Sequence, residues 1–320
     1  MTTSLKEKKV QVSLLVPVYN EEENLKELFR QLTGIFERAG RTFEIIFIDD
    51  GSKDRSLEIL KGFQSENPNL VIVELMRNFG QHAAAAAGLS VASGEYISVI
   101  DADLQNDPED LITMWDELDK GHDVVRGFRK DRKDPSWRKL ASKVVNWMTG
   151  YMTGVYLKDY GCSIIALKRN IVDNLNLCSE RSRHTSALIS WMGGNVKVIP
   201  VKHRERKGSK SRYSFFKLLK MTTDIVTGFS TIPLQLVEWT GVITSIFGLL
   251  LGTILFIKYF LFGAAATSMS IIIAIICFFF GIHFLALGVI GEYIARIFVE
   301  VQNRPYYMIK NVHENRASFK

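Results

Sequence analysis

The sequence predicts an α/β protein in which a mostly parallel sheet is followed by two membrane-spanning helices. Apolar, strand-like runs alternate with helical stretches from Val12 to about Gly127, as in sheets built from strand–helix–strand units. Two long uncharged segments occupy the last third of the chain. Polar side chains gather directly after three of the predicted strands. These patterns predict a catalytic domain attached to a membrane anchor.

The expected strands are continuous apolar runs rather than alternating apolar and polar residues. Helices therefore cover both faces of the sheet. The predicted strands are 12–18, 43–49, 70–75, 96–101 and 123–127, and the predicted helices are about 22–39, 56–65, the stretch around 83–87 and the residues after Pro108. Residues 128–213 are less regular and contain loops rich in Arg, Lys and Gly.

Ligands of parallel sheets bind beyond the carboxyl ends of the strands. In this sequence the residues at those ends are Tyr19, Asn20 and Glu21 after the first strand, Asp49 and Asp50 after the second, and Asp101 and Asp103 after the fourth. The first turn, PVYNEE, contains no glycine fingerprint, which disfavours a dinucleotide site. An acidic rim at this edge indicates that a metal ion carries the phosphates of a substrate.

The triplet Asp101-Ala102-Asp103, followed by Leu104 and Gln105, is the strongest local signal for chemistry. Two neighbouring carboxylates repel each other unless a cation lies between them. Oxygen ligands favour Mg²⁺ or Mn²⁺, so Asp101, Asp103 and the Gln105 amide oxygen are the predicted metal ligands. The alternative is that Asp101 only caps the next helix or a turn.

The two uncharged segments are Trp239–Ile257 and Ser268–Ile290, the latter interrupted only by the titratable His283. Each is long enough to cross a hydrocarbon core of about 30 Å. The alternative is a pair of buried core helices. His283 and Glu292 lie in or beside the second predicted span, where an ionisable residue can be functional. We expect a neutral His283 that packs between helices of neighbouring subunits.

The charges flanking these segments predict their orientation. Eight Lys or Arg residues and one acid lie between Lys202 and Lys220, whereas the connector 258–267 has a single Lys. Positive charge on the inner side predicts a hairpin with both chain termini in the cytoplasm. Pro17 and polar residues come before any long apolar stretch at the N-terminus, so we expect no signal peptide there.

The predicted organisation is a cytoplasmic catalytic domain over 1–213, juxtamembrane interfacial helices over 214–238, a transmembrane hairpin over 239–291 and a cytoplasmic tail over 292–320. Residues 214–238 suit a helix in the headgroup layer, ended by Pro233 before the span; packing on the catalytic domain is the alternative. The net charge of +6 comes largely from basic residues beside the spans, which indicates anionic lipid rather than nucleic acid as partner. The three scattered cysteines have no metal-ligand spacing.

Several motifs together resemble a known family. VPVYNEEENL, IDDGSKDRS and DADLQNDPED resemble the family 2 glycosyltransferases, which have a Rossmann-like GT-A fold. NFGQHAAAAAGL, DLQNDPED, DYGCSIIALKR and LGVIGEYIARI resemble the polyprenyl-phosphate glycosyltransferases, and among them the undecaprenyl-phosphate formamido-arabinose transferases. The resemblance runs from about Val12 to Tyr306.

The resemblance also implies roles for individual residues. By matching position, Pro17, Tyr19, Glu21 and Asp50 hold the nucleoside, Asp101, Asp103 and Gln105 hold the diphosphate and its Mn²⁺ or Mg²⁺, and Arg129, Arg138 and Ser142 meet the lipid phosphate. Asp159 is expected near the reacting centre, Arg206, Ser211 and Arg212 in a loop that closes on the diphosphate, and His82 in the donor pocket or as a helix cap. The loop departs from the family pattern, because its glycine lies one place early and Arg212 stands where lysine is common.

The resemblance implies inverting transfer of a sugar from a nucleotide diphosphate donor to undecaprenyl phosphate. The implied donor is UDP-linked, with formamido-arabinose among the candidate sugars. The product would serve envelope or lipopolysaccharide modification such as that of lipid A. The expected location is the bacterial inner membrane and the expected assembly is a homotetramer. A lipid phosphate with a second pKa near 6 is largely a dianion at neutral pH and needs no strong general base.

Four alternative functions are compatible with the same residues to different degrees. The first two are a dolichol-phosphate mannose synthase with a guanosine donor and an undecaprenyl-phosphate glucosyltransferase. A processive polysaccharide synthase is a third, although the QxxRW-type motif and additional spans of that class are absent from the sequence. The fourth is a non-catalytic membrane adaptor, which the complete acidic set of Asp50, Asp101 and Asp103 disfavours.

Overall fold

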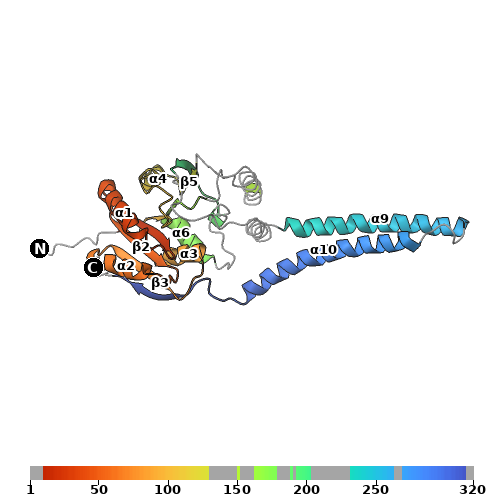
Figure 1. The fold of residues 1–320 in the computed structure, drawn as a ribbon. Coiled ribbons are helices and arrows are strands. Elements are labelled where there is room, and N and C mark those ends of the chain that lie inside the picture. The colour runs from red at the N-terminus through yellow and green to blue at the C-terminus, as the bar shows by residue number, and fades with distance from the viewer. Residues whose placement is uncertain are drawn as a thin grey trace. The chain divides into compact units, whose positions relative to one another are not determined.

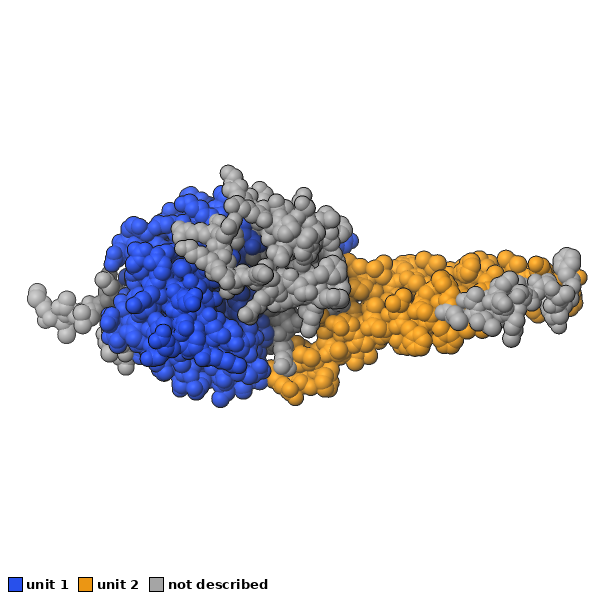
Figure 2. Space-filling view, viewed as in Figure 1, with its two compact units in different colours: residues 1–214, 305–320 blue, residues 215–304 orange. Residues whose placement is uncertain are grey.

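The computed structural model describes residues 10–129, 150–151, 162–178, 188–189, 192–202, 231–262 and 269–314. The chain forms two compact units (Figure 2). Residues 1–214 and 305–320 make up the first unit, which contains the sheet. Residues 215–304 make up the second, which contains two long helices. The sheet therefore includes chain segments from both sides of the helices in the sequence.

The described strands form one sheet in the order β7-β5-β6-β4-β1-β2-β3-β8. The strands are β1 (Val12–Val18), β2 (Phe43–Asp49), β3 (Leu70–Leu75), β4 (Tyr96–Val99), β5 (Val124–Arg129), β6 (Ile165–Lys168), β7 (Val196–Val201) and β8 (Ile309–His313). Strands β4, β1, β2 and β3 run parallel, as do β5 and β7, whereas β6 and β8 are antiparallel to their neighbours. The predicted mostly parallel α/β sheet is confirmed.

Helices cover both faces of this sheet (Figure 1). They are α1 (Leu25–Ala39), α2 (Ser56–Glu66), α3 (Gln81–Val91), α4 (Asp110–Asp119) and α6 (Arg169–Leu177). On one face, α1 and α4 share a core in which Phe36 stacks on Trp115 with ring centroids 5.4 Å apart. On the other, the alanine-rich α3 lies close to β1 and β2, and a Cβ on Gly88 would come within 2.8 Å of the Ile48 side chain. The small residues of α3 therefore bring its N-terminus close to the carboxyl ends of these strands.

The tail after the second long helix supplies β8, an edge strand that the sequence did not predict. It pairs antiparallel with β3, and Met76 N donates to the carbonyl of Met308 at 2.9 Å beyond the ladder. The buried Glu74 of β3 accepts hydrogen bonds from the side chains of Lys310 at 2.5 Å and Asn311 at 3.1 Å. The tail is therefore bound to the sheet of the first unit by backbone pairing and by a buried carboxylate.

Burial alone would raise the pKa of Glu74, but its hydrogen bonds to Lys310, Asn311 and His313 outweigh burial and lower the pKa to about 2. A carboxyl group whose pKa is lower in the folded than in the unfolded state stabilises the fold at pH values above its unfolded-state pKa. This stabilisation is lost as the pH falls through the folded-state pKa. Glu74→Gln should therefore lower the unfolding free energy by about 1–3 kcal/mol at pH 7, since screening weakens the pairing with the exposed Lys310. The difference from wild type should shrink between about pH 4.5 and pH 2.

Thermal unfolding of the two proteins over this pH range measures the effect, and hydrogen exchange of the 309–313 amides at pH 7 locates it. Glu58→Gln, at an exposed position on α2, is the matched control. A Glu74→Gln protein with wild-type exchange at these amides would show that the carboxylate does not hold the tail.

The second unit consists of α9 (Ile232–Phe262) and α10 (Met269–Val301), which lie side by side in Figure 1. Both are long and apolar enough to cross a membrane, over Ile232–Lys258 and Phe278–Val301. At their contact, a Cβ on Gly248 would lie 3.7 Å from the ring of Phe279. The predicted pair of apolar helices is confirmed.

The expected end of an interfacial helix at Pro233 is corrected by the structure. Helix α9 begins at Ile232 and continues through Pro233, so residues 232–238 belong to the long helix. A proline is tolerated in a first turn because its missing N–H would have no partner inside the helix. Residues 214–230 lie outside the described part of the chain.

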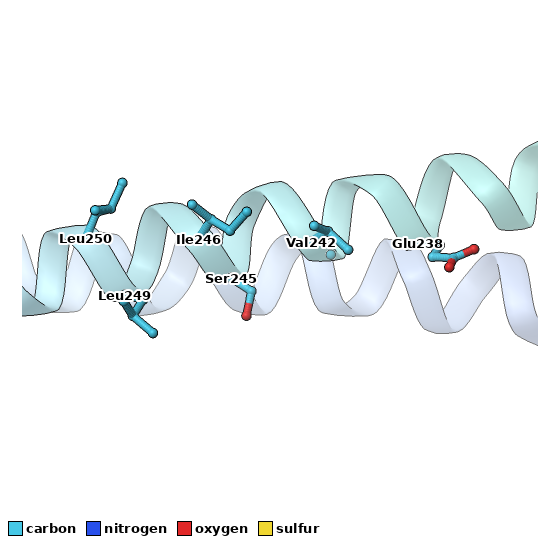
Figure 3. A pocket seen from close by; sticks show the side chains of 7 residues that line it. Glu238, Val242, Ser245, Ile246, Leu249 and Leu250 are labelled. Atoms are coloured by element: carbon cyan, nitrogen blue, oxygen red, sulfur yellow. The ribbon is translucent and has the colours of Figure 1, made fainter.

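A groove of ≈ 620 Å³ follows one stretch of α9 from Glu238 to Leu250 (Figure 3). Its lining side chains recur every three or four residues along this one helix. Most of these residues are apolar, and the groove contains none of the predicted site residues, so the candidate active site lies elsewhere.

On α10, Glu292 forms an ion pair with Arg296 one turn later, at 3.1 Å.

Candidate active site

The ends of β1, β2 and β4 border a cleft of ≈ 240 Å³. The lining residues are Pro17, Val18, Tyr19, Glu21, Asp50, Asn78, Gly80, Gln81, Asp101, Ala102 and Asp103. Six residues predicted from the sequence are among them: Pro17, Tyr19, Glu21, Asp50, Asp101 and Asp103. The parallel order of the three strands explains this convergence, because their carboxyl ends meet at the same edge of the sheet.

Pro17 occupies a position on a central strand that a proline can tolerate. The β1–β4 pairing ends at Leu15 opposite Val99, and Ile100 N donates to the Leu15 carbonyl. Backbone groups two residues apart in a strand point to the same side, so an N–H at position 17 would point toward β4, as the Leu15 carbonyl does. The pairing of β4 with β1 has ended by then, so the N–H that Pro17 lacks would have no partner in the ladder. The proline thereby ends the ladder where the cleft begins.

The loop after β1 is tied to the loop after β2. Asn20, in the left-handed region at φ 55°, accepts a hydrogen bond from Lys53 N at 2.8 Å. The backbone N–H of Glu21 donates to the Ser56 hydroxyl at 3.0 Å. Asparagine is one of the few residues that adopt this conformation readily. These bonds fix the backbone that presents Tyr19 and Glu21 to the cleft.

Asp50 is buried and holds the loop that precedes α3. Its two carboxylate oxygens accept hydrogen bonds from Phe79 N at 2.7 Å and Gly80 N at 2.9 Å. Burial raises the pKa of Asp50, and these two bonds oppose that effect. The predicted role at the nucleoside stays a prediction; the structure adds that Asp50 determines where Asn78, Gly80 and Gln81 lie.

Asp101 and Asp103 follow β4 in a turn whose residue Leu104 has φ 59°. Such a conformation is unfavourable for a leucine and persists only where surrounding contacts impose it. Asp103 Oδ1 accepts a hydrogen bond from Gln105 N at 3.1 Å. Asp101 does not cap the next helix, because α4 begins at Asp110 with Glu109 as its N-cap residue.

Burial raises the pKa of Asp101 to about 6, and the negative charges of Asp103 and Glu21 add to this effect. Hydrogen bonds from the Ser163 hydroxyl and the Gln81 amide oppose it. The Asp101 and Asp103 carboxylates therefore repel each other, as expected where a bound cation would lower their energy.

The residues of the cleft fit a metal ion that takes part of its coordination from a substrate. The described residues contain no group of three His, Cys, Asp or Glu side chains able to enclose a metal. Mg²⁺ commonly binds one or two carboxylates together with substrate phosphates, which matches the pair Asp101 and Asp103. Gln105, the third predicted ligand, does not line the cleft, so its amide stays a predicted ligand only.

The remaining predicted residues lie apart from the cleft or outside the described residues. Arg129 is the last residue of β5 and is not among the cleft residues. His82 is the second residue of α3; it is not the helix cap, since that position is Gly80. Desolvation by the surrounding protein lowers the pKa of His82, which favours the neutral ring at pH 7. Outside the described residues are Arg138, Ser142, Asp159, Arg206, Ser211 and Arg212.

The segment 78–81 contributes to the cleft without having been predicted from the sequence. Asn78, Gly80 and Gln81 line the cleft although they precede a helix rather than follow one of the strands singled out. The glycine before the alanine-rich helix could have indicated a turn at this point. In the structure Gly80 has φ 97°, a conformation that glycine adopts readily, and the chain turns there into α3.

Comparison with known proteins identifies the domain that carries the cleft. Residues 13–170 match the family model described as glycosyl transferase family 2. Among solved structures, mannosyl-3-phosphoglycerate synthase from Rubrobacter xylanophilus is 16% identical with a TM-score of 0.50, over 68% of this chain and 71% of that one. This likeness concerns the fold alone.

Two further structures are similar at lower TM-scores. S. aureus TarS 1–349 in complex with UDP-GlcNAc is 18% identical with a TM-score of 0.47, over 68% of this chain and 66% of that one. The mannosyltransferase PcManGT from Pyrobaculum calidifontis, in complex with GDP-Man and Mn²⁺, is 20% identical with a TM-score of 0.45, over 59% and 55%. The chain thus spans less than two thirds of either protein. Residues 13–170 thus match glycosyltransferase family 2, and the sheet described above is of the GT-A-like α/β type.

Proposed function

We propose that this chain transfers a sugar from a nucleotide diphosphate donor to the phosphate of a polyprenyl lipid at the cytoplasmic face of a membrane. The observation that carries the proposal is the cleft in which Asp101 and Asp103 meet Tyr19, Glu21 and Asp50 within a glycosyltransferase family 2 domain. The carboxylates lie at the strand edge where such sheets bind their ligands.

The donor half of the proposal rests on the charge of this cleft. A nucleotide diphosphate is an anion, and an acidic cleft can hold it only through a cation. Mn²⁺ or Mg²⁺ held by Asp101 and Asp103, with Gln105 as a further predicted ligand, would stabilise the leaving diphosphate as a Lewis acid. The walls contributed by Pro17, Tyr19 and Asn78 suit a nucleoside.

The acceptor half rests on the two apolar helices. The first unit contains the chain both before residue 215 and after residue 304, and β8 pairs with β3 in the same sheet. If both helices cross a membrane, the two ends of the hairpin must lie on the same side, because a folded sheet cannot be divided by a bilayer. A hairpin of this kind supports an acceptor whose tail stays in the membrane while its head group reaches a cytoplasmic site.

The proposed chemistry is electrostatic. A lipid phosphate dianion attacks the anomeric carbon, the bond to the diphosphate breaks, and a single displacement inverts that centre. The attacking phosphate needs positive charge beside it to approach the charged donor. Arg129 and Arg138 are proposed to supply that charge and, together with the Ser142 hydroxyl, to orient the phosphate. Asp159 is proposed to orient the sugar or the acceptor. Arg206, Ser211 and Arg212 are proposed to close over the diphosphate.

The finer identities rest on the sequence resemblance alone. We propose a UDP-linked donor, formamido-arabinose among the candidates, undecaprenyl phosphate as acceptor, and a role in lipopolysaccharide modification. A homotetramer in the bacterial inner membrane is proposed on the same ground.

Release of nucleotide diphosphate from a panel of UDP- and GDP-sugars tests the proposal. The purified full chain in detergent with Mn²⁺ should release nucleotide from one donor at least tenfold faster when undecaprenyl phosphate is present. Equal release with and without the lipid would contradict the lipid acceptor. Nucleotide binding without release from any donor would favour a membrane adaptor.

A further inference from the structure

The Asp101 carboxylate is held by side chains from two elements that are far apart in the sequence. The Gln81 amide, in the first turn of α3, donates a hydrogen bond to Asp101 Oδ1. The Ser163 hydroxyl, just before β6, is the second side chain whose hydrogen bonding to this carboxylate lowers the pKa of Asp101. Neither residue was singled out from the sequence.

The sheet register explains why Ser163 meets Asp101. Strands β4 and β6 are antiparallel, with Val99 opposite Ile165. Continuing this register by two residues on each strand places Asp101 opposite Ser163. Directly opposite residues on one side of an antiparallel pair bring their side chains close together. The contact is therefore built into the pairing of these two strands.

A third side chain, that of Asn106, orients the Ser163 hydroxyl. The amide nitrogen of the buried Asn106 donates to Ser163 Oγ at 3.2 Å. Because Oγ accepts from Asn106, its own proton is available for the Asp101 carboxylate, which can only accept while it is ionised. Hydrogen bonds arranged in such a chain strengthen one another in a protein interior.

These hydrogen bonds connect the Asp101 carboxylate to two different segments of the chain. Gln81 belongs to the segment that lines the donor side of the cleft, and Asp50 holds that segment through Phe79 and Gly80. Ser163 directly follows the DYGC motif. The Asp101 carboxylate thus receives one hydrogen bond from the cleft-lining segment 78–81 and one from the segment that leads into β6.

We propose that Gln81 and Ser163 are positioning residues that aim the Asp101 carboxylate and thereby set how tightly the cleft binds a nucleotide diphosphate together with its metal ion. The inference rests on the proposed function, because it assumes a metal-bridged nucleotide in the cleft. Without these two hydrogen bonds the carboxylate rotates away from the geometry that the metal requires, while the nucleoside contacts remain.

Calorimetric binding of UDP and of GDP to the full-length protein in detergent, with Mn²⁺ and with EDTA, tests the inference. Gln81→Ala and Ser163→Ala should each weaken Mn²⁺-dependent binding of the preferred nucleotide by about five- to tenfold. The weaker binding expected in EDTA should differ by less than about twofold between these variants and wild type. Ser163→Thr keeps the hydroxyl and should restore most of the metal-dependent affinity.

Matched controls separate positioning from general damage. Gln31→Ala on α1 removes another amide-to-carboxylate hydrogen bond, and Ser90→Ala on α3 removes a hydroxyl bonded to the helix backbone. Both should bind as wild type does. Wild-type Mn²⁺-dependent affinity in Gln81→Ala and Ser163→Ala, or equal losses with Mn²⁺ and with EDTA, would overturn the inference. A wild-type protein that binds neither nucleotide would instead overturn the proposed function, and this inference with it.

Discussion

Asp103→Asn should lower sugar transfer by about 10²–10³-fold at saturating donor, because the variant loses a negative charge that neutralises the metal ion bridging the diphosphate. The side chain keeps its size, and its remaining oxygen can still accept the hydrogen bond from Gln105 N. The fold should therefore be retained. Initial rates over a range of Mn²⁺ concentrations measure the effect, and the half-saturating Mn²⁺ concentration should rise.

Asp116→Asn is the matched control for this change. It removes a carboxylate from the exposed face of α4, where Asp116 lies 3.9 Å from Arg41. Its transfer rate should equal that of wild type, since exposed ion pairs contribute little. Near-normal transfer by Asp103→Asn in excess Mn²⁺ would show that the carboxylate does not hold the metal.

Gly51→Ala should weaken nucleotide binding strongly by displacing the loop held by Asp50. Gly51 has φ 67°, and a Cβ there would lie 2.6 Å from the carbonyl carbon of Arg77 and 2.8 Å from Asn78 N. Backbone atoms cannot yield as a flexible side chain can, so the loop leading to Phe79 and Gly80 must move. We expect a more than tenfold loss of affinity and a loss of about 2–4 kcal/mol in unfolding free energy.

Gly40→Ala separates the two contributions to this effect. Gly40 ends α1 with φ 61°, but nothing lies within 4 Å of the position of an added Cβ. The control should therefore show only the conformational cost of a left-handed alanine, about 1–2 kcal/mol, and unchanged nucleotide binding. Equal binding losses in Gly51→Ala and Gly40→Ala, measured by calorimetry beside thermal unfolding, would contradict the clash with the loop.

The regular part of the fold could be predicted because its signals are local. The run VSLLVPV is apolar except for Ser13 and becomes a strand buried on both faces. The carboxylates that follow such strands converge for a topological reason, so the order of strands and helices along the chain was enough to assign Glu21, Asp50, Asp101 and Asp103 to one edge. The two apolar helices likewise follow from length and composition.

Other features depend on contacts between distant segments and leave no local signal. Strand β8 is five residues of mixed polarity, IKNVH, and becomes a strand only because the exposed edge of β3 and the buried Glu74 receive it. The bond between Ser163 and Asp101 depends on the register of β4 and β6. The start of α9 at Ile232 was missed because Pro233 was interpreted as a break rather than as a first-turn residue.

The most direct test of the central claim is the formation of a labelled lipid. Purified protein, Mn²⁺, undecaprenyl phosphate and a panel of radiolabelled nucleotide sugars should give an organic-extractable product with one donor, and Asp103→Asn should not form it at a comparable rate. Label that stays in the aqueous phase with every donor, while the nucleotide still binds, would contradict transfer to a lipid phosphate.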